Sequence, residues 1–91
     1  MEQKCISIEL RGRVQGVAFR HHTKIQAEKL GVEGLVRNQS DGSVYIEACG
    51  SEDQLELFIN WCHRGPLMAN VTGIKIIDIP SKTYKGFSIR Y

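Results

Sequence analysis

The segment LRGRVQGVAFRHH, residues 10–22, connects two kinds of sequence pattern and decides how the fold begins. Before it, apolar and polar residues alternate from Ile6 to Leu10, which is the period of a half-buried strand. Beyond it, apolar residues recur at helical spacing until Gly31, a common helix C-terminus. The apolar side of this helix is expected to hold Phe19, Ile25 and Leu30. The sequence therefore predicts a strand, a glycine-containing loop and a helix.

A β-hairpin and two more strands are expected farther along the chain. Residues 32–38 are largely apolar, and the Asp41–Gly42 pair that follows them favours a tight turn. Residues 44–48 then alternate between apolar and polar, so the two segments predict a hairpin. Residues 71–79 and 87–91 are expected to form the last two strands.

The second helix has clear boundaries in the sequence. Ser51 is followed three residues later by Gln54, which is the spacing of a capping box at a helix N-terminus. At the other end, Gly65 permits a positive φ and Pro66 prevents the helix from continuing. Trp61 is expected to lie in the core. Four more apolar residues recur with helical spacing and are expected to face the core: Leu55, Phe58, Ile59 and Cys62.

The predicted order of elements is strand, helix, strand, strand, helix, strand, with one short extra strand. This order favours an α+β fold of the ferredoxin-like split βαβ type, a sandwich in which an antiparallel sheet carries both helices on one face. Right-handed crossovers place the first and third strands side by side and antiparallel. The chain is long enough for one modest core, so residues 1–91 are expected to form a single domain.

This strand pairing brings two cysteines together. Cys5 shares the parity of Glu9, so it is expected to face solvent at the start of the first strand. Cys49 shares the parity of Glu47 and is expected on the same face at the end of the third strand. The two thiols can form a disulfide, for which the loop-closure model gives about 4 kcal/mol. They can also stay reduced in a reducing compartment. The sequence leaves both states open.

Composition excludes several classes of function. The 91 residues carry a net charge of +2 with the basic residues scattered, which is too mild for nucleic-acid binding. No apolar run approaches the ~20 residues of a membrane span, and the start MEQKCISIEL lacks the order of a signal peptide. A cytoplasmic protein without membrane contact is therefore expected. The three cysteines form no C-x-x-C pair, which argues against structural zinc.

The start of the first helix carries an unusual set of charges. If the helix begins just after Gly16, its first turns hold four basic side chains and no carboxylate: Arg20, His21, His22 and Lys24. Backbone N–H groups at a helix start favour negative charge, so each cation there costs a few tenths to about 1 kcal/mol. The conflict disappears if a ligand supplies the negative charge. Gly12 and Gly16 allow the preceding loop to aim N–H groups at an anion, as phosphate sites at helix N-termini do.

Two interpretations of these residues remain open at this point. In one, Arg20 closes over a bound anion with its planar set of donors. In the other, Arg20 is a solvated surface residue and the glycines only form a tight turn. Neither nucleotide-binding glycine motif is present, so a nucleotide is not expected. His21, His22 and His63 are expected to be solvated or to pack beside the loop rather than bind a metal, because adjacent histidines on a helix point about 100° apart.

Two long motifs carry a resemblance to a known family. LRGRVQGVAFR, residues 10–20, and GLVRNQSDGSVYIEACG, residues 34–50, resemble the two signature stretches of the acylphosphatases. The likeness extends to AEKLGVEG between them, to FINWCHRGP and to FSIRY, so it covers nearly the whole chain. The resemblance implies a small, monomeric hydrolase without metal or other cofactor. Such an enzyme splits acyl phosphates, which are carboxyl-phosphate anhydrides, into a carboxylate and inorganic phosphate.

By this resemblance the catalytic residues are Arg20 and Asn38. The implied phosphate-binding set combines backbone N–H groups of the loop with the arginine side chain: Gln15, Gly16, Val17, Ala18, Phe19 and Arg20. Asn38 is implied to position the attacking water, since its amide offers both an acceptor and a donor. From composition alone Asn38 is equally well a turn residue. In a split βαβ fold its strand runs parallel to the first, so Asn38 is expected at the same sheet edge as the loop after Leu10.

One position departs from the family pattern. Leu35 stands where the family usually has an aromatic residue, which is expected to change packing behind the site rather than its chemistry. The expected partners are a small-molecule acyl phosphate and the phosphate product. The alternatives are a catalytically inert anion-binding or regulatory module of the same fold, and an RNA-binding ferredoxin-like domain. The second lacks the aromatic strand motif and the basic surface that RNA binding needs.

Overall fold

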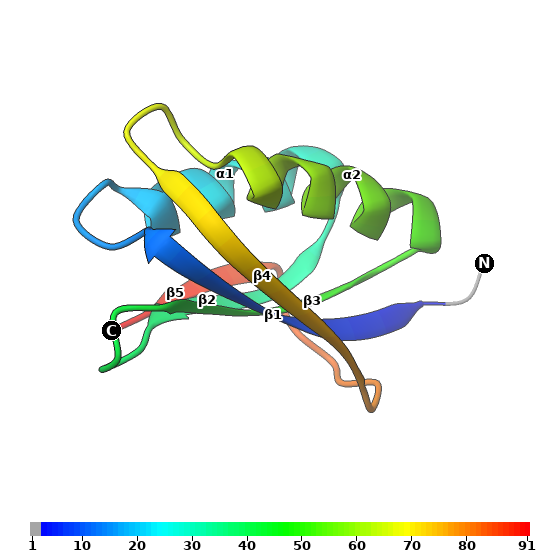
Figure 1. Cartoon of the computed structure of the whole chain (residues 1–91). Coiled ribbons are helices and arrows are strands. Elements are labelled where there is room, and N and C mark those ends of the chain that lie inside the picture. Colours follow the sequence, from blue (N-terminus) through cyan, green and yellow to red (C-terminus); the bar gives the residue numbers. More distant parts are fainter. Residues whose placement is uncertain (1–2) are drawn as a thin grey trace.

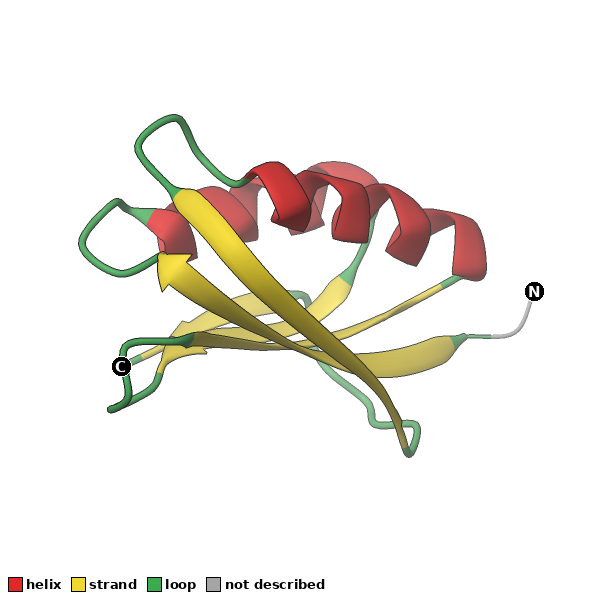
Figure 2. Cartoon of the chain, in the orientation of Figure 1, coloured by secondary structure: helices red, strands yellow, loops and turns green. Residues whose placement is uncertain are grey.

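Both helices lie on one face of a twisted sheet (Figures 1 and 2). The computed structural model describes residues 3–91. Its elements in chain order are β1 (Lys4–Arg13), α1 (Phe19–Leu30), β2 (Glu33–Asn38), β3 (Val44–Gly50), α2 (Glu52–Arg64), β4 (Asn70–Ile79) and β5 (Phe87–Arg90). This two-layer arrangement confirms the ferredoxin-like α+β fold. Within the described residues, no helix has both the length and the apolar composition needed to cross a bilayer.

The sheet has the strand order β4-β1-β3-β2-β5. As predicted, β1 and β3 are antiparallel neighbours. β4 pairs antiparallel with β1, and β2 pairs antiparallel with β3. The sheet is mixed rather than wholly antiparallel, because β5 pairs parallel to β2. Residues 80–86 reverse the chain after β4, so β5 runs opposite to β4 and in the direction of β2. As a result β1, β2 and β5 all finish at the same end of the sheet.

The core lies between the sheet and the two helices. Ile8, Ile46 and Val36 of the three central strands are fully buried in one cluster with Phe58 of α2. The other predicted core residues of α2 belong to this cluster or pack against it: Leu55, Ile59, Trp61 and Cys62. The boundaries of α2 also follow the prediction, since Ser51 and Gln54 form the reciprocal bonds of a capping box.

The first helix begins later than predicted. It starts at Phe19 rather than just after Gly16, and Ala18 precedes it in a left-handed conformation with φ of 58°. The prediction of its inner side was wrong at Ile25, which is 39% exposed. With the helix starting at Phe19, the inward positions at i and i+4 spacing go to Phe19, Thr23 and Ala27. The missing carboxylate is confirmed, because the first turn holds no acidic residue.

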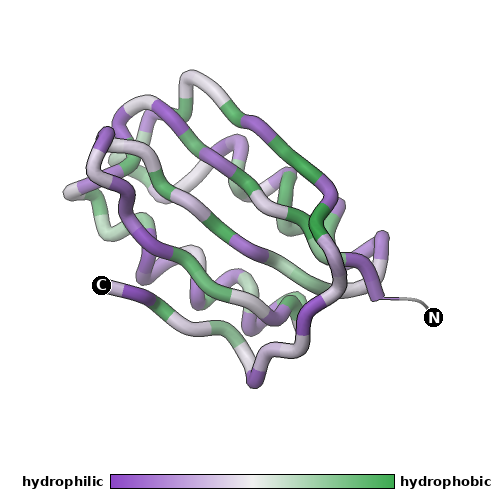
Figure 3. The backbone as a smooth tube through the Cα atoms, turned by 90° about the horizontal axis from the view of Figure 1, so that it is seen from below, coloured by the Kyte–Doolittle hydropathy of each residue, from purple (hydrophilic) through white to green (hydrophobic). Residues whose placement is uncertain are grey.

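The helix-free face of the sheet is partly covered by the segment that joins β4 to β5 (Figure 3). Cys5 and Cys49 are directly opposite each other in the β1–β3 register and form a disulfide. The prediction that both face solvent was wrong, since each is at most 3% exposed. The backbone N–H of Lys82 donates to Cys5 Sγ at 3.5 Å, so residues 80–86 lie over the sulfurs.

Glu47 is the centre of a polar cluster on this same face. Its carboxylate accepts hydrogen bonds from the hydroxyls of Tyr45 and Tyr84 and forms an ion pair with Lys82 at 3.3 Å. Burial acts to raise the pKa of the Glu47 carboxyl, but these three donors together outweigh it and hold the pKa below its ordinary value. Burial and the neighbouring carboxylate raise the pKa of Tyr45 to about 12. The cluster fastens residues 80–86 to the sheet.

Candidate active site

A cavity of about 220 Å³ lies at the end of the sheet where β1, β2 and β5 finish. The β1–α1 loop, the β2–β3 turn and the end of β5 come together there, on the left of Figure 1. Six of the seven residues that the resemblance assigns to the site line this cavity: Gln15, Gly16, Ala18, Phe19, Arg20 and Asn38. The seventh, Val17, instead packs its side chain against the core.

Residues 15–18 of the loop between β1 and α1 curl so that their backbone N–H groups make no hydrogen bond within the described chain. Gly16 and Ala18 have φ of 74° and 58°, which bends the chain tightly before α1. The N–H groups on either side are paired: Val14 donates to the carbonyl of Gly12 and His22 to that of Ala18, both at 3.1 Å. Between them, the N–H groups of residues 15–20 have no acceptor within the described chain. Such a run of unpaired donors at a helix start suits an anion.

Arg20 is the second residue of α1 and lines the cavity. Its Nη1 donates to the carbonyl of Arg90 at 3.3 Å, and its Cζ lies 4.7 Å from the ring centroid of Tyr91. Its other edge, formed by Nε and Nη2, has no hydrogen-bond partner among residues 3–91. Sequence reasoning missed the contribution of Arg90 and Tyr91, because no local pattern links two residues 70 positions apart.

Asn38 is the last residue of β2 and pairs with Val44 across the hairpin. It has the parity of Val36, whose side chain is fully buried on the helix side of the sheet, so Asn38 faces the same side as α1. The structure brings Asn38 and Arg20 to one cavity from different elements. The Asn38 amide makes no hydrogen bond to another described residue, which leaves its donor and acceptor available.

Gln15 is one of the residues that line the cavity, and its side-chain amide forms hydrogen bonds to another part of the chain. Nε2 donates to the carbonyl of Gln39 at 2.8 Å and to that of Ser43 at 2.9 Å. These two carbonyls belong to the β2–β3 turn, directly after Asn38. The side chain of Gln15 therefore connects the loop to the turn.

The described side chains that line the cavity include no carboxylate. Arg20 and His21 are its basic residues, and none of the described residues that line it is Asp or Glu. His21 and His22 are exposed, with ring centroids 5.5 Å apart, and His63 is exposed at the end of α2. Residues 3–91 contain no group of three or more histidine, cysteine or carboxylate side chains able to hold a metal ion. No acidic side chain of the described lining therefore opposes an anion that enters the cavity.

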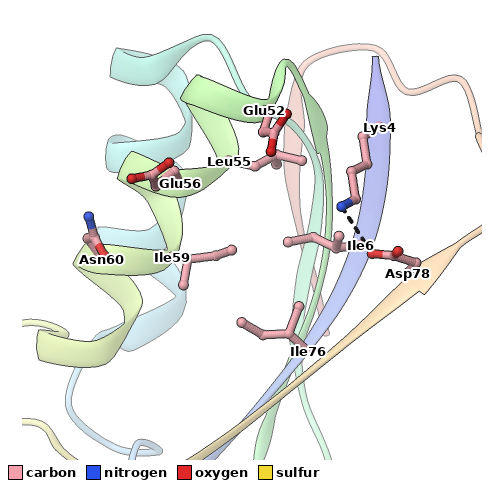
Figure 4. A pocket seen from close by; sticks show the side chains of 9 residues that line it. All are labelled: Lys4, Ile6, Glu52, Leu55, Glu56, Ile59, Asn60, Ile76 and Asp78. Atoms are coloured by element: carbon pink, nitrogen blue, oxygen red, sulfur yellow. Dashed lines mark ion pairs between the residues drawn. The ribbon is translucent and has the colours of Figure 1, made fainter. Parts of the chain in front are cut away.

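A second cavity, of about 240 Å³, lies between α2 and the β1–β4 edge of the sheet (Figure 4). Its floor is apolar, and includes Ile6, Leu55 and Ile76. Its rim carries Glu52, Glu56 and the ion pair between Lys4 and Asp78, whose charged atoms are 3.4 Å apart. Carboxylates at the rim disfavour a phosphate, so the first cavity is the candidate site.

Leu35 lies on the face of the sheet away from this site. It pairs with Glu47 of β3 and Ser88 of β5, and its side chain is half-buried. Its parity is opposite to that of Val36, which faces the helices. A change of residue type at Leu35 therefore alters packing on the opposite face of the strand that carries Asn38.

Comparison with known proteins identifies the family. The acylphosphatase family model matches residues 6–89. A curated acylphosphatase of Ligilactobacillus salivarius is 50% identical over 82 residues, which is 88% of this chain and 90% of the relative. The crystal structure of an acylphosphatase from Bacillus subtilis matches with TM-score 0.93 and 35% identity, over 99% of this chain and 100% of that one. The chain also matches 12% of full-length HypF in a phosphate- and nucleotide-bound form, with TM-score 0.93 and 32% identity over 99% of its own length. The chain belongs to the acylphosphatase family, hydrolases that act on acid anhydrides.

Proposed function

We propose that the cavity hydrolyses acyl phosphates to a carboxylate and inorganic phosphate. The observation that carries this proposal is the placement of unpaired loop N–H groups, Arg20 and Asn38 around one cavity whose described lining has no Asp or Glu side chain. Membership of the acylphosphatase family supports the same reaction and a small-molecule substrate.

The phosphoryl group of the substrate binds in the loop of residues 15–19. Backbone N–H groups there and the partial positive charge at the start of α1 offset the charge on the phosphoryl oxygens. Arg20 supplies a full positive charge, and its Nε–Nη2 edge is suited to two parallel hydrogen bonds with two oxygens. Because these groups are held in place before the substrate arrives, they favour the in-line transition state of phosphoryl transfer.

A water positioned by Asn38 attacks the phosphorus opposite the acyl oxygen. The carbonyl oxygen of the Asn38 amide accepts one hydrogen bond from this water, which orients a lone pair toward the phosphorus. The bond between phosphorus and the acyl oxygen breaks, and the carboxylate leaves with the electron pair. Carboxylates are good leaving groups, so no general acid is required. An amide is too weak a base to take the proton, which passes to a phosphoryl oxygen of the substrate.

The same proposal includes a monomer that works in the cytoplasm. One chain supplies every part of the site, from the loop of residues 14–20 to Asn38 and Tyr91, so no second copy is needed to complete it. The disulfide between Cys5 and Cys49 runs against this location, because disulfides are rare in reducing compartments. The redox state of these two cysteines in the cell is therefore informative about location.

The test of the proposed function is hydrolysis of benzoyl phosphate by the purified protein in the presence of a metal chelator. Removing Arg20 is expected to cost about 3 to 4 kcal/mol of transition-state stabilisation, or roughly 10²- to 10³-fold in rate. The Arg20→Ala protein is expected to fold, because the arginine makes its contacts at the surface. Inorganic phosphate is expected to inhibit competitively. Phosphate binding without turnover in the unaltered protein would support the inert anion-binding module instead.

A further inference from the structure

Gln15 connects the loop that is proposed to bind phosphate with the turn that follows Asn38, the residue proposed to position the attacking water. We propose that it is a positioning residue, which fixes the phosphate-binding loop relative to Asn38 and does not itself bind phosphate through its side chain. The inference rests on the proposed function, because it assigns Gln15 a role only through the water held by Asn38. In this inference the side chain of Gln15 holds the loop in place, whereas the backbone N–H groups of the loop bind phosphate.

The contacts of Gln15 use its full capacity as a donor. A glutamine amide has two N–H bonds, and the two acceptors of Nε2 are the carbonyls of Gln39 and Ser43 at 2.8 Å and 2.9 Å. Since both partners are carbonyl oxygens, only the NH₂ end of the amide can face them. Neither N–H is then left for a phosphoryl oxygen.

The turn that receives these bonds is itself fixed. Its two carbonyls also accept backbone bonds, from Gly42 to Gln39 at 3.1 Å and from Gln39 to Ser43 at 2.9 Å. The Asp41 carboxylate accepts the N–H of Ser43 at 3.0 Å and forms an ion pair with Arg11 of β1 at 3.0 Å. The turn is therefore a stable point of attachment rather than a mobile loop tip.

Asn38 lies immediately before this turn. Gln39 follows it in the chain, and its strand partner Val44 follows Ser43, so the two carbonyls bound by Gln15 flank the Asn38–Val44 pair. Among the described side chains, only Gln15 forms a hydrogen bond between the loop of residues 14–18 and the turn. Misplacement of a catalytic group by about 1 Å can cost roughly 10²-fold in rate. Loss of this link is thus expected to affect attack more than phosphate binding.

The experiment compares Gln15→Met with the unaltered protein. Methionine has a similar length and no charge, but it cannot donate to the two carbonyls. We expect kcat for benzoyl phosphate to fall at least about 10-fold, while the inhibition constant for inorganic phosphate changes less than about 3-fold. Gln26→Met on α1 is the matched control and is expected to leave both constants unchanged, since Gln26 makes no side-chain hydrogen bond within residues 3–91. A lower thermal midpoint with unchanged kcat would show a merely structural role and overturn the proposal.

A double-mutant cycle with Asn38→Ala tests whether Gln15 affects turnover through Asn38. If Gln15 acts through Asn38, adding Gln15→Met to Asn38→Ala is expected to change the residual rate less than about 2-fold. A full multiplicative loss in the double variant would show that Gln15 acts elsewhere and would overturn the inference. If Asn38→Ala alone keeps full turnover, the water-positioning role in the proposed function fails, and the inference falls with it. If only the inference about Gln15 is wrong, Asn38→Ala is inactive while Gln15→Met keeps its activity.

Discussion

Substitution of Asn38 allows phosphate binding and turnover to be measured separately. Its amide faces the cavity side of the sheet without a partner among the described residues, while the donors proposed to bind phosphate belong to another part of the chain. For Asn38→Ala we expect the dissociation constant for inorganic phosphate to change less than about 3-fold. Turnover of benzoyl phosphate should fall by about two orders of magnitude, because the attacking water loses its orientation. Phosphate titration and initial rates on the same preparation check both expectations.

Asn38→Asp is the companion variant. It keeps the size of the side chain but adds a negative charge next to the phosphoryl site, so phosphate is expected to bind more weakly than in Asn38→Ala. Weaker phosphate binding in Asn38→Ala together with intact turnover contradicts the water-positioning role.

Single residues differ in how far the sequence predicts their roles. Arg20 is visible as a candidate because a cation at a helix start conflicts with the backbone charge there. The positioning of Arg20 by Arg90 and Tyr91 is not visible, because that contact exists only once β5 has paired with β2. The direction of the Gln15 amide is hidden for the same reason, since its acceptors are backbone atoms of a distant turn.

The two helices show why some elements are predicted better than others. α2 starts with a side-chain capping box, so its first residue follows from the local sequence. α1 has no side-chain cap, and it starts after Ala18 in a left-handed conformation that is uncommon for alanine. A pattern of apolar residues does not encode such a start, which explains the error in both the beginning of α1 and its inner side.

The position of Cys5 opposite Cys49 was predictable, but their burial was not, and the sequence left their disulfide open. Strand parity and the antiparallel β1–β3 arrangement place the two residues opposite each other. Their cover comes from residues 80–86, a segment without periodicity that is attached to the sheet by Lys82 and by Tyr84. The alternation of residues in a strand can therefore assign a sheet face to solvent, although a connecting segment covers that face in the folded protein.

Breaking the disulfide is expected to lower the stability of these paired strands. The two cysteines are 44 residues apart, for which the loop-closure model gives about 4 kcal/mol of stabilisation. Urea unfolding of the unaltered protein with and without a dithiol reductant measures this difference. Intact mass after denaturation and reduction should rise by two hydrogens. The Cys5→Ala, Cys49→Ala double variant is the control and should not respond to reductant, whereas an unchanged mass in the unaltered protein shows that no bond was present.

The stability of the whole molecule is expected to fall at alkaline pH. The folded protein holds the pKa of Tyr45 at about 12, above the ordinary value of about 10, because burial and Glu47 favour the neutral phenol. Burial and Glu47 likewise raise the pKa of Tyr84. Stabilisation from a raised pKa is fully present below the unfolded value and is lost as pH rises toward the folded one. Unfolding free energies should therefore decline between about pH 10 and pH 12.

Glu47 gives the opposite dependence at acid pH. Its folded pKa lies below the ordinary value, so its contribution is present above that value and is lost as pH falls through the folded pKa. In Glu47→Gln both dependences should weaken, since the charge that acts on the two tyrosines is gone. Denaturation curves across pH for the two proteins make the comparison, and identical curves contradict a role for the cluster.

At the scale of the whole fold, the direction of the strands explains where the site lies. β1, β2 and β5 are mutually parallel although they are not all neighbours, so their ends meet at one end of the sheet. The β1–α1 loop, Asn38 and Tyr91 follow from these three ends. This convergence was predictable for the first two, because it follows from the split βαβ order alone.

The bond between Cys5 and Cys49 also makes part of the backbone a closed ring. The ring contains α1, β2 and nearly all of β1 and β3, and the exposed turn at residues 40–42 lies within it. One cut there opens the ring but does not divide the molecule. The piece with Arg20 and Asn38 stays covalently attached to the piece with α2, β4 and β5. Under oxidising conditions such a nicked protein keeps the mass of the intact chain plus one water, and it separates into two fragments only when the disulfide is reduced.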